Sequence, residues 1–286
     1  VITHLPIGGA QDNTLYTIEL LDKNKYDISL CCNFEGELVD RAKRISGVTL
    51  INIPFLCREV SLYNDLRSLI VLYKLFKNED FTIVHTHSSK AGLLARIAAK
   101  LNKTPIIIHT LHGFAFNDFM NLFKKKFYII LEKILAMWTD VLITVSNLNR
   151  KKIIDLKIAK KENIINIYSG IDFDLFTNER NNNFRRELNL NNDHFLIGSV
   201  GRLSLQKDPI TMVSAFDIVV KRFPNAHLVL VGDGELREKI VEKIDELKLN
   251  DKIHLTGNKS SPWKIYHSMD LFIMSSIYEG LGRSIT

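Results

Sequence analysis

Residues 81–111 have the sequence FTIVHTHSSKAGLLARIAAKLNKTPIIIHTL, in which two apolar runs flank an amphipathic stretch. The second run, PIIIHTL, is continuous rather than alternating, which is typical of a strand buried on both faces. The segment 89–101 between the two runs has the apolar spacing of a helix. A strand, a helix and a second strand in this order form a βαβ unit, so the stretch predicts a parallel sheet covered by helices.

The same alternation continues along the chain. Further strands are expected at 1–5, 26–32, 49–53, 140–146, 163–170, 195–201, 227–233, 252–257 and 271–276. Further helices are expected at 63–78, 120–138, 147–159, 208–222, 235–248 and 262–268. The polar, Asn-rich stretch 171–193 lacks periodicity and is interpreted as a linker. We therefore predict an α/β chain with two Rossmann-like βαβ domains, 1–170 and 194–286, that face a cleft.

Composition and charge limit the class of protein. Hydrophobic content of 46% and charged content of 24% are those of a soluble globular chain. We see no membrane-spanning stretch and no signal peptide, so we expect a cytoplasmic protein. Residues 1–170 hold 23 Lys and Arg against 16 Asp and Glu, a balance of +7, whereas 171–286 hold 15 against 16, a balance of −1. A basic first half suits an anionic partner such as a membrane surface or a phosphorylated acceptor, although composition alone also fits an ordinary solvated surface.

The three cysteines are Cys31, Cys32 and Cys57, and none is part of a Cys-x-x-Cys pair. Neighbouring residues on a strand point to opposite faces, which argues against a disulfide or a metal site formed by Cys31 and Cys32 together. We expect buried, reduced thiols rather than a disulfide or a metal site.

Polar residues follow the strands of the second half, where ligands of open parallel sheets bind. Arg202 and Lys207 come after the strand 195–201, and Asp208-Pro209 predicts an N-cap and the first residue of a helix. Two cations beside a helix N-terminus make an anion site, with two ordinary surface side chains as the alternative. Gly234 follows the next strand, but a third glycine of the dinucleotide fingerprint would fall at Arg237, which argues against NAD.

Candidates at the remaining strand ends are weaker one by one. They are Thr256 and Gly257, then the carboxylate and flexible turn of Glu279, Gly280, Leu281 and Gly282, and in the first half Gly8 and Gly9, whose backbone amides could face a phosphate. His85, His87, His109 and His112 follow two neighbouring strands and raise the question of zinc. Because no Asp or Glu completes such a ligand set, we expect hydrogen-bonded core histidines and no metal.

Taken together, these pieces resemble the retaining GT-B glycosyltransferases of glycosyltransferase family 4, also described as glycosyl transferases group 1. The matching stretches cover essentially the whole chain: IGGAQDNTL, HTHSSKAGLLARIAAK, HTLHGFAF, DVLITVSN, IYSGID, GRLSLQKD, VLVGDGELR and SSIYEGLGRSIT. The family carries a Glu, seven residues and a second Glu. With Glu279 as the first, the second would be residue 287, so the resemblance implies a fragment cut at both ends, with an incomplete second domain.

The resemblance also implies a reaction. A sugar moves from a nucleotide diphosphate donor, by family habit a UDP-sugar, to a glycan or lipid-linked acceptor in cell-surface polysaccharide synthesis. Arg202 and Lys207 would hold the diphosphate, replacing a metal ion, with the amides of Gly8 and Gly9 facing it. Glu279 would contact the donor sugar and His112 would lie near it. Gly234, Thr256, Gly257, Gly280, Leu281 and Gly282 complete the expected donor-binding set. No cofactor, metal or nucleic acid partner is expected.

Two other functions stay open at this point: a nucleotide-sugar epimerase, and a non-catalytic module that binds nucleotide sugars. The segment 119–138, FMNLFKKKFYIILEKILAMW, is the remaining question. We expect its apolar face to pack on the sheet and its lysines to make peripheral contact with an anionic membrane, on the inner face.

Overall fold

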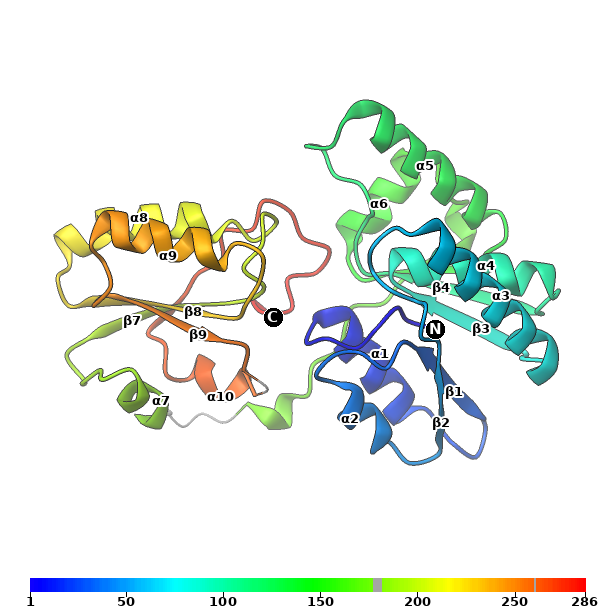
Figure 1. Cartoon of the computed structure of the whole chain (residues 1–286), viewed down its shortest axis with the longest axis horizontal. Coiled ribbons are helices and arrows are strands. Elements are labelled where there is room, and N and C mark those ends of the chain that lie inside the picture. The colour runs from blue at the N-terminus through cyan, green and yellow to red at the C-terminus, as the bar shows by residue number, and fades with distance from the viewer. Residues whose placement is uncertain (177–181, 260) are drawn as a thin grey trace. The chain divides into compact units, whose positions relative to one another are not determined.

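Parallel sheets form the centre of both halves of the chain. The structure is a computed structural model that describes residues 1–176, 182–259 and 261–286. It divides into two units, Val1–Gly170 (unit 1) and Ile171–Thr286 (unit 2), each with its own sheet (Figure 1). Every strand pair in these sheets is parallel, as the βαβ pattern predicts.

In unit 1 a short extended segment joins two groups of strands. One group is β1 (Ile28–Cys32) and β2 (Val48–Asn52), and the other has the order β3 (Ile83–His87), β4 (Ile106–Leu111), β5 (Val141–Thr144) and β6 (Ile164–Asn166). Ile2 N donates to Cys31 O at 3.0 Å on one side, and His87 N donates to Val1 O at 2.8 Å on the other. The strand predicted at 1–5 is therefore reduced to an isolated bridge at His4, although its backbone still links β1 to β3.

Helices cover both faces of this sheet. They are α1 (Gly9–Leu20), α2 (Val39–Lys43), α3 (Leu62–Glu79), α4 (Ser89–Leu101), α5 (Leu122–Ala136) and α6 (Asn147–Asp155). Cys31 packs with the core residues of α3 and α4, whereas Cys32 packs with those of α1 and α2. Neighbouring strand residues thus face opposite cores, and both thiols are free and buried as expected. Cys57 is half-buried, so the expectation of burial is wrong there, because it lies in a loop after β2.

Unit 2 has a four-stranded sheet with the order β10 (Leu271–Phe272), β7 (Phe195–Val200), β8 (Ala226–Val231) and β9 (Ile253–Gly257). Figure 1 shows α8 (Pro209–Arg222) and α9 (Arg237–Leu247) on one face, and α7 (Asn182–Glu187) and α10 (Trp263–Tyr266) on the other. All six side chains of β8 are buried, since the strand is central and covered on both faces.

The predicted linker 171–193 is partly built into unit 2. Residues 177–181 lie outside the described residues. The Arg185 guanidinium of α7 is buried and donates to Ser268 O at 2.9 Å and to the Asp270 carboxylate at 3.1 Å. Asp270 also accepts the amide of Leu196 at 2.7 Å. Phe184 of the same helix is also buried, in a core cluster with Leu196 and Ile265, so one apolar and one charged side chain hold a helix that the polar sequence does not predict.

Helix α5 is fastened to α4 by a buried ion pair. Arg96 Nη2 lies 3.1 Å from Glu132 Oε2, and Arg96 Nε donates to Gly92 O at 2.8 Å. Burial lowers the pKa of Arg96, and the Glu132 charge opposes that shift. Removing one member of such a pair leaves the other charge buried without a partner, which costs far more than the pair contributes.

We therefore expect Glu132→Ala to destabilise unit 1 by about 3–5 kcal/mol. The exposed pair Lys43–Asp40 of the same unit provides the control, and Asp40→Ala should cost less than about 1 kcal/mol. The chain has two tryptophans, one in each unit, so a Trp263→Phe background lets Trp138 fluorescence report urea unfolding of unit 1 alone. Equal unfolding midpoints for Glu132→Ala and its parent would contradict a structural role for the pair.

Candidate functional site

The loop after β7 carries the two predicted cations. Arg202 is exposed, and Lys207 lies half-buried beside the helix that follows. Asp208 has left-handed backbone angles (φ 47°, ψ 55°), and its carboxylate accepts the amide of Thr211 at 3.3 Å. Pro209 then begins α8, so the predicted cap and helix start are confirmed.

A second loop, after β10, is joined to the first by main-chain contacts. The Ser275 hydroxyl donates to the carbonyl oxygens of Lys207 and Asp208, at 2.7 and 2.8 Å. Ile277 N donates to Gln206 O at 2.9 Å. β10 ends at Phe272, although Ile273 N still donates to Gly198 O of β7 at 2.9 Å, so the predicted strand 271–276 is too long.

The same contact brings together two charged candidates that are 72 residues apart in the chain. Lys207 Nζ pairs with the Glu279 carboxylate, and both side chains are half-buried. Gln206 Nε2 supports the pair by donating to Tyr278 O at 2.9 Å. The sequence analysis missed Gln206 and the hydroxyl of Ser275 as supports, although Gln206 adjoins Lys207 and Ser275 lies in the predicted strand 271–276.

Two glycines hold the first loop against β8. A Cβ at Gly232, whose φ is +141°, would lie 2.0 Å from Gly201 O. A Cβ at Gly234 would lie 2.4 Å from Leu203 O. No side chain fits at either distance, so both glycines are needed for the backbone to approach. Gly234 therefore has a packing role in the structure, and its donor contact stays a prediction.

A small cavity opens at the carboxyl end of β7. Its lining consists of Ser199, Val200, Gly201, Arg202, Leu203, Lys207, Pro209, Met212, Leu230, Val231, Met274 and Ser276. Arg202 and Lys207 thus line the same cavity, which lies at the N-terminus of α8. The guanidinium of Arg202 can make a bidentate contact with an anion, and the ammonium of Lys207 adds a point charge beside it.

The remaining unit 2 candidates lie around this recess or apart from it. Gly257 has a φ of +68°, with open space where a Cβ would be, and its carbonyl accepts Gly232 N at 2.9 Å. Gly282 packs beside Met274, and Gly280 and Leu281 are half-buried in the same loop. Thr256 instead lines a different pocket, whose wall includes Phe184, Glu187, His254 and Lys259.

In unit 1, Gly8 and Gly9 lie at the start of α1, with Gly8 as the extended N-cap residue. Helix N-terminal amides attract anions, which fits the predicted use of this turn. His112 follows β4 in the same unit, and its Nε2 lies 3.0 Å from His87 Nδ1. The two rings stack with centroids 5.3 Å apart.

The other histidines of unit 1 are hydrogen-bonded in the core, as predicted. His85 Nε2 meets the Thr110 hydroxyl at 2.8 Å, and His109 Nδ1 meets the Thr86 hydroxyl at 2.8 Å. Burial lowers the pKa of His85 to about 3 and also lowers those of His87 and His109. Within the described ranges, no three His, Cys, Asp or Glu side chains are arranged to hold a metal ion.

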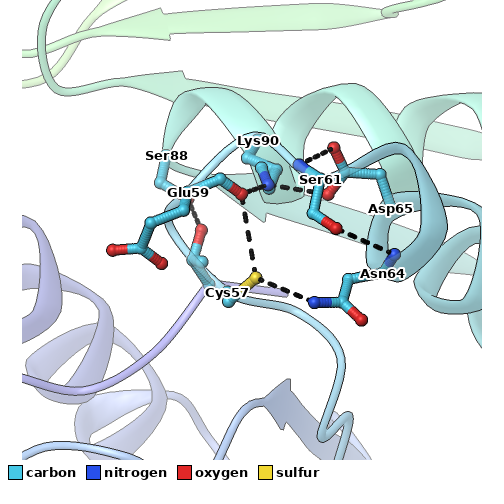
Figure 2. A network of polar contacts seen from close by, with 8 residues as sticks. Cys57, Glu59, Ser61, Asn64, Asp65, Ser88 and Lys90 are labelled. Carbon is cyan, nitrogen blue, oxygen red and sulfur yellow. Dashed lines mark hydrogen bonds and ion pairs between the residues drawn. The ribbon is translucent and has the colours of Figure 1, made fainter.

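The loop before α3 is tied to the first turn of α4 by a polar network (Figure 2). Lys90 Nζ lies 2.6 Å from the Asp65 carboxylate and also contacts the carbonyl of Glu59. Cys57 Sγ accepts from Asn64 Nδ2 at 3.9 Å. Lys90 therefore serves as a structural tie, which the motif HTHSSK does not reveal.

Comparison with known proteins adds family evidence for both units. The family described as Glycosyltransferase Family 4 matches residues 7–175, and the family described as Glycosyl transferases group 1 matches residues 180–286. The chain is 35% identical over 284 residues to an Escherichia coli UDP-Gal:alpha-D-GlcNAc-diphosphoundecaprenol alpha-1,3-galactosyltransferase, covering 98% of this chain and 73% of that protein. It is 31% identical to the Staphylococcus aureus capsular polysaccharide biosynthesis glycosyltransferase CapM, covering 93% of this chain and 70% of that protein.

Solved structures show the same fold. The Anabaena protein HepE, solved in complex with UDP and glucose, superimposes with a TM-score of 0.77 at 16% identity, covering 99% of this chain and 76% of that one. Sucrose-phosphate synthase from Thermosynechococcus elongatus gives a TM-score of 0.76 at 18% identity, covering 98% of this chain and 73% of that one. The predicted α/β GT-B fold is confirmed.

The close approach at Gly232 predicts a large effect of one methyl group. We expect Gly232→Ala to destabilise unit 2 by about 3 kcal/mol or more, because the new Cβ overlaps Gly201 O. Gly201→Ala is the matched control, since its Cβ would meet only the Lys207 side chain at an ordinary 3.5 Å. Urea unfolding followed by Trp263 in a Trp138→Phe background measures both, and similar midpoints for the two variants would refute the packing argument.

The buried histidines predict acid sensitivity of unit 1. The unfolded chain takes up protons near pH 6.5, whereas folded His85 does so only near its pKa of about 3. Stability is therefore full above pH 6.5 and falls below it, by about 2 kcal/mol at pH 5 for His85 alone. His85→Gln keeps a hydrogen-bond partner for Thr110 but cannot take up a proton. It should therefore reduce the loss of unfolding free energy between pH 6.5 and pH 5, measured by urea unfolding at the two pH values. If the variant loses as much unfolding free energy between these pH values as the parent does, groups other than His85 cause the loss of stability in acid.

Proposed function

Because the chain belongs to glycosyltransferase family 4, we propose that it transfers a sugar from a UDP-sugar to a lipid-linked acceptor in cell-surface polysaccharide synthesis, with retention of configuration. The first relative acts, by its name, with UDP-Gal on a GlcNAc-diphosphoundecaprenol, and the second belongs to capsule synthesis. The first name supports the UDP-sugar donor and the polyprenyl-linked acceptor proposed for this chain, and the second supports its proposed part in polysaccharide synthesis.

The observation that carries the proposal is the pairing of cations with a carboxylate at the end of β7. Arg202 and Lys207 line one recess, and Lys207 contacts Glu279. In the proposed reaction the leaving diphosphate gains negative charge, so the strongest catalytic contribution comes from positive groups already fixed beside it. Arg202 supplies a guanidinium fork, Lys207 an ammonium, and the N-terminus of α8 adds its amides.

Glu279 has a second part in this proposal. A diphosphate at the recess competes with the carboxylate for Lys207, and a sugar hydroxyl donates to the carboxylate in exchange. One ion pair is thereby replaced by two charge-assisted contacts, so the recess keeps its charges paired in both conditions. The sugar donor, which carries both a diphosphate and a sugar, can therefore provide a contact for Lys207 and another for Glu279.

The other assignments rest on the resemblance. The amides of Gly8 and Gly9 are proposed for phosphate, and His112 for a sugar hydroxyl. Thr256, Gly257, Gly280, Leu281 and Gly282 are proposed for the rest of the donor. No metal is proposed for the reaction, since the cations carry the diphosphate charge. The lipid-linked acceptor places the proposed reaction at the inner surface of the membrane.

Replacing Arg202 and Lys207 together by Ala should lower kcat by about 100- to 1,000-fold or more, which is the range for losing preorganised charge stabilisation. The assay measures UDP release from a panel of UDP-sugars with a polyprenyl-diphosphate sugar as acceptor. Lys239→Ala on α9 with Lys248→Ala at its C-cap is the charge-matched control, since both side chains are exposed. Chelation with EDTA should leave the activity of the parent unchanged.

Four results would contradict the proposal in different ways. Near-normal turnover in the double variant would remove the cations from catalysis. Isomerised sugar without acceptor product would indicate an epimerase, and UDP-sugar binding without turnover would indicate a binding module. Loss of activity on chelation would show that a metal takes part.

A further inference from the structure

Helix α5 presents an apolar stripe to solvent. Phe123, Phe127, Ile130 and Met137 are 85%, 62%, 56% and 73% exposed and follow each other at helical spacing. We call α5 stripe the exposed set Phe119, Leu122, Phe123, Phe127, Ile130, Ile134 and Met137. The expectation that the apolar face of 119–138 packs on the sheet is therefore wrong for half of the helix. The stripe is too large and continuous to be a scatter of surface residues.

The opposite face of α5 accounts for its orientation. Leu135 and Ala136 are buried, and Glu132 reaches inward to Arg96 on α4. The helix is thus held on one side by core packing and an ion pair, and the α5 stripe points away from that attachment. Figure 1 shows α5 along the margin of unit 1.

The charges along the stripe are mostly positive, and the exposed carboxylate of Asp118 before Phe119 is paired with Lys125 at 2.7 Å. Lys124 and Lys126 are exposed and Lys133 is half-buried, and all three flank the apolar residues on the helix. Glu132 is the only acidic residue between 119 and 139, and it is buried against Arg96. Large apolar side chains bordered by lysines, with no exposed carboxylate from 119 to 139, match an anionic bilayer surface.

The length of α5 determines whether it could span a bilayer or lie in its interface. Its 15 residues extend about 22 Å, short of the roughly 30 Å hydrocarbon core. In the part of the chain that the structure describes, no helix has the length and hydropathy to cross a membrane. The helix therefore fits the interface plane, with its apolar face at the acyl boundary and its lysines at the headgroups.

We propose that the α5 stripe and Lys124, Lys126 and Lys133 form a surface that docks the chain on anionic lipid bilayers. Phenylalanine and isoleucine side chains enter the boundary between headgroups and acyl chains, and the lysines contact lipid phosphates. This surface deepens the proposed function by bringing the chain to a lipid-linked acceptor. Its use for catalysis rests on that function, but its binding to lipid does not.

The test is flotation of the whole chain with vesicles of phosphatidylglycerol and phosphatidylcholine, with no sugar donor or acceptor present. Phe123→Ser, Phe127→Ser and Ile130→Ser together should lower the partition coefficient by about 100-fold or more. Lys124→Gln, Lys126→Gln and Lys133→Gln together should lower it by about 100-fold, at about fivefold for each lysine. High salt should weaken binding of the parent.

Matched controls lie on unit 2. Ile218→Ser with Phe223→Ser removes exposed apolar residues from α8 and its end, and Lys221→Gln, Lys239→Gln and Lys248→Gln remove three lysines. Neither control should change vesicle binding. All substituted side chains are exposed or half-buried, and circular dichroism and urea unfolding confirm that each variant is folded.

The proposal fails if the parent does not float with anionic vesicles, or if the α5 variants float as the parent does. It also fails if the parent self-associates in sedimentation and the serine variant does not, with no vesicle binding by either, because the stripe is then a protein interface. Since UDP-sugar turnover is measured separately, a chain that floats but has no activity would contradict the proposed function alone.

Discussion

Two carbonyl oxygens, those of Gly201 and Leu203, approach the α-carbons of Gly232 and Gly234 so closely that no side chain fits between them. This contact fixes the loop after β7 against the end of β8. The loop in turn supplies the carbonyls of Lys207 and Asp208, to which the Ser275 hydroxyl binds. The position of Glu279 beside Lys207 thus depends on the close backbone packing that Gly232 and Gly234 allow.

Much of the architecture could be predicted from local pattern. The helix 89–101 and the cap at Asp208 agree with the structure because each depends on residues adjacent in the sequence. Features set by distant partners could not be predicted. The residues after Phe272 bind another loop through the Ser275 hydroxyl, and the segment 182–193 is held by the buried guanidinium of Arg185 together with the buried side chain of Phe184. Helical periodicity shows which residues of α5 share a face. It does not show whether another element covers that face.

The candidate site shows the same division. Arg202, Lys207 and Glu279 could be selected because all follow strands of one sheet, whose carboxyl ends share an edge. The sequence could not show that Lys207 and Glu279 touch, or that Gly234 is needed for packing. Thr256 was chosen by the same rule, yet it lines another pocket, with Phe184, His254 and Lys259.

The extended segment at the start of unit 1 has a consequence for folding. Its backbone bonds reach Cys31 on one side and His87 on the other, so the middle of the sheet joins residues that are far apart in sequence. Contacts of high sequence separation close late and slow the search for the native topology. During synthesis the segment must wait until β3 has left the ribosome, and the edges of β1 and β3 stay open to mispairing until then.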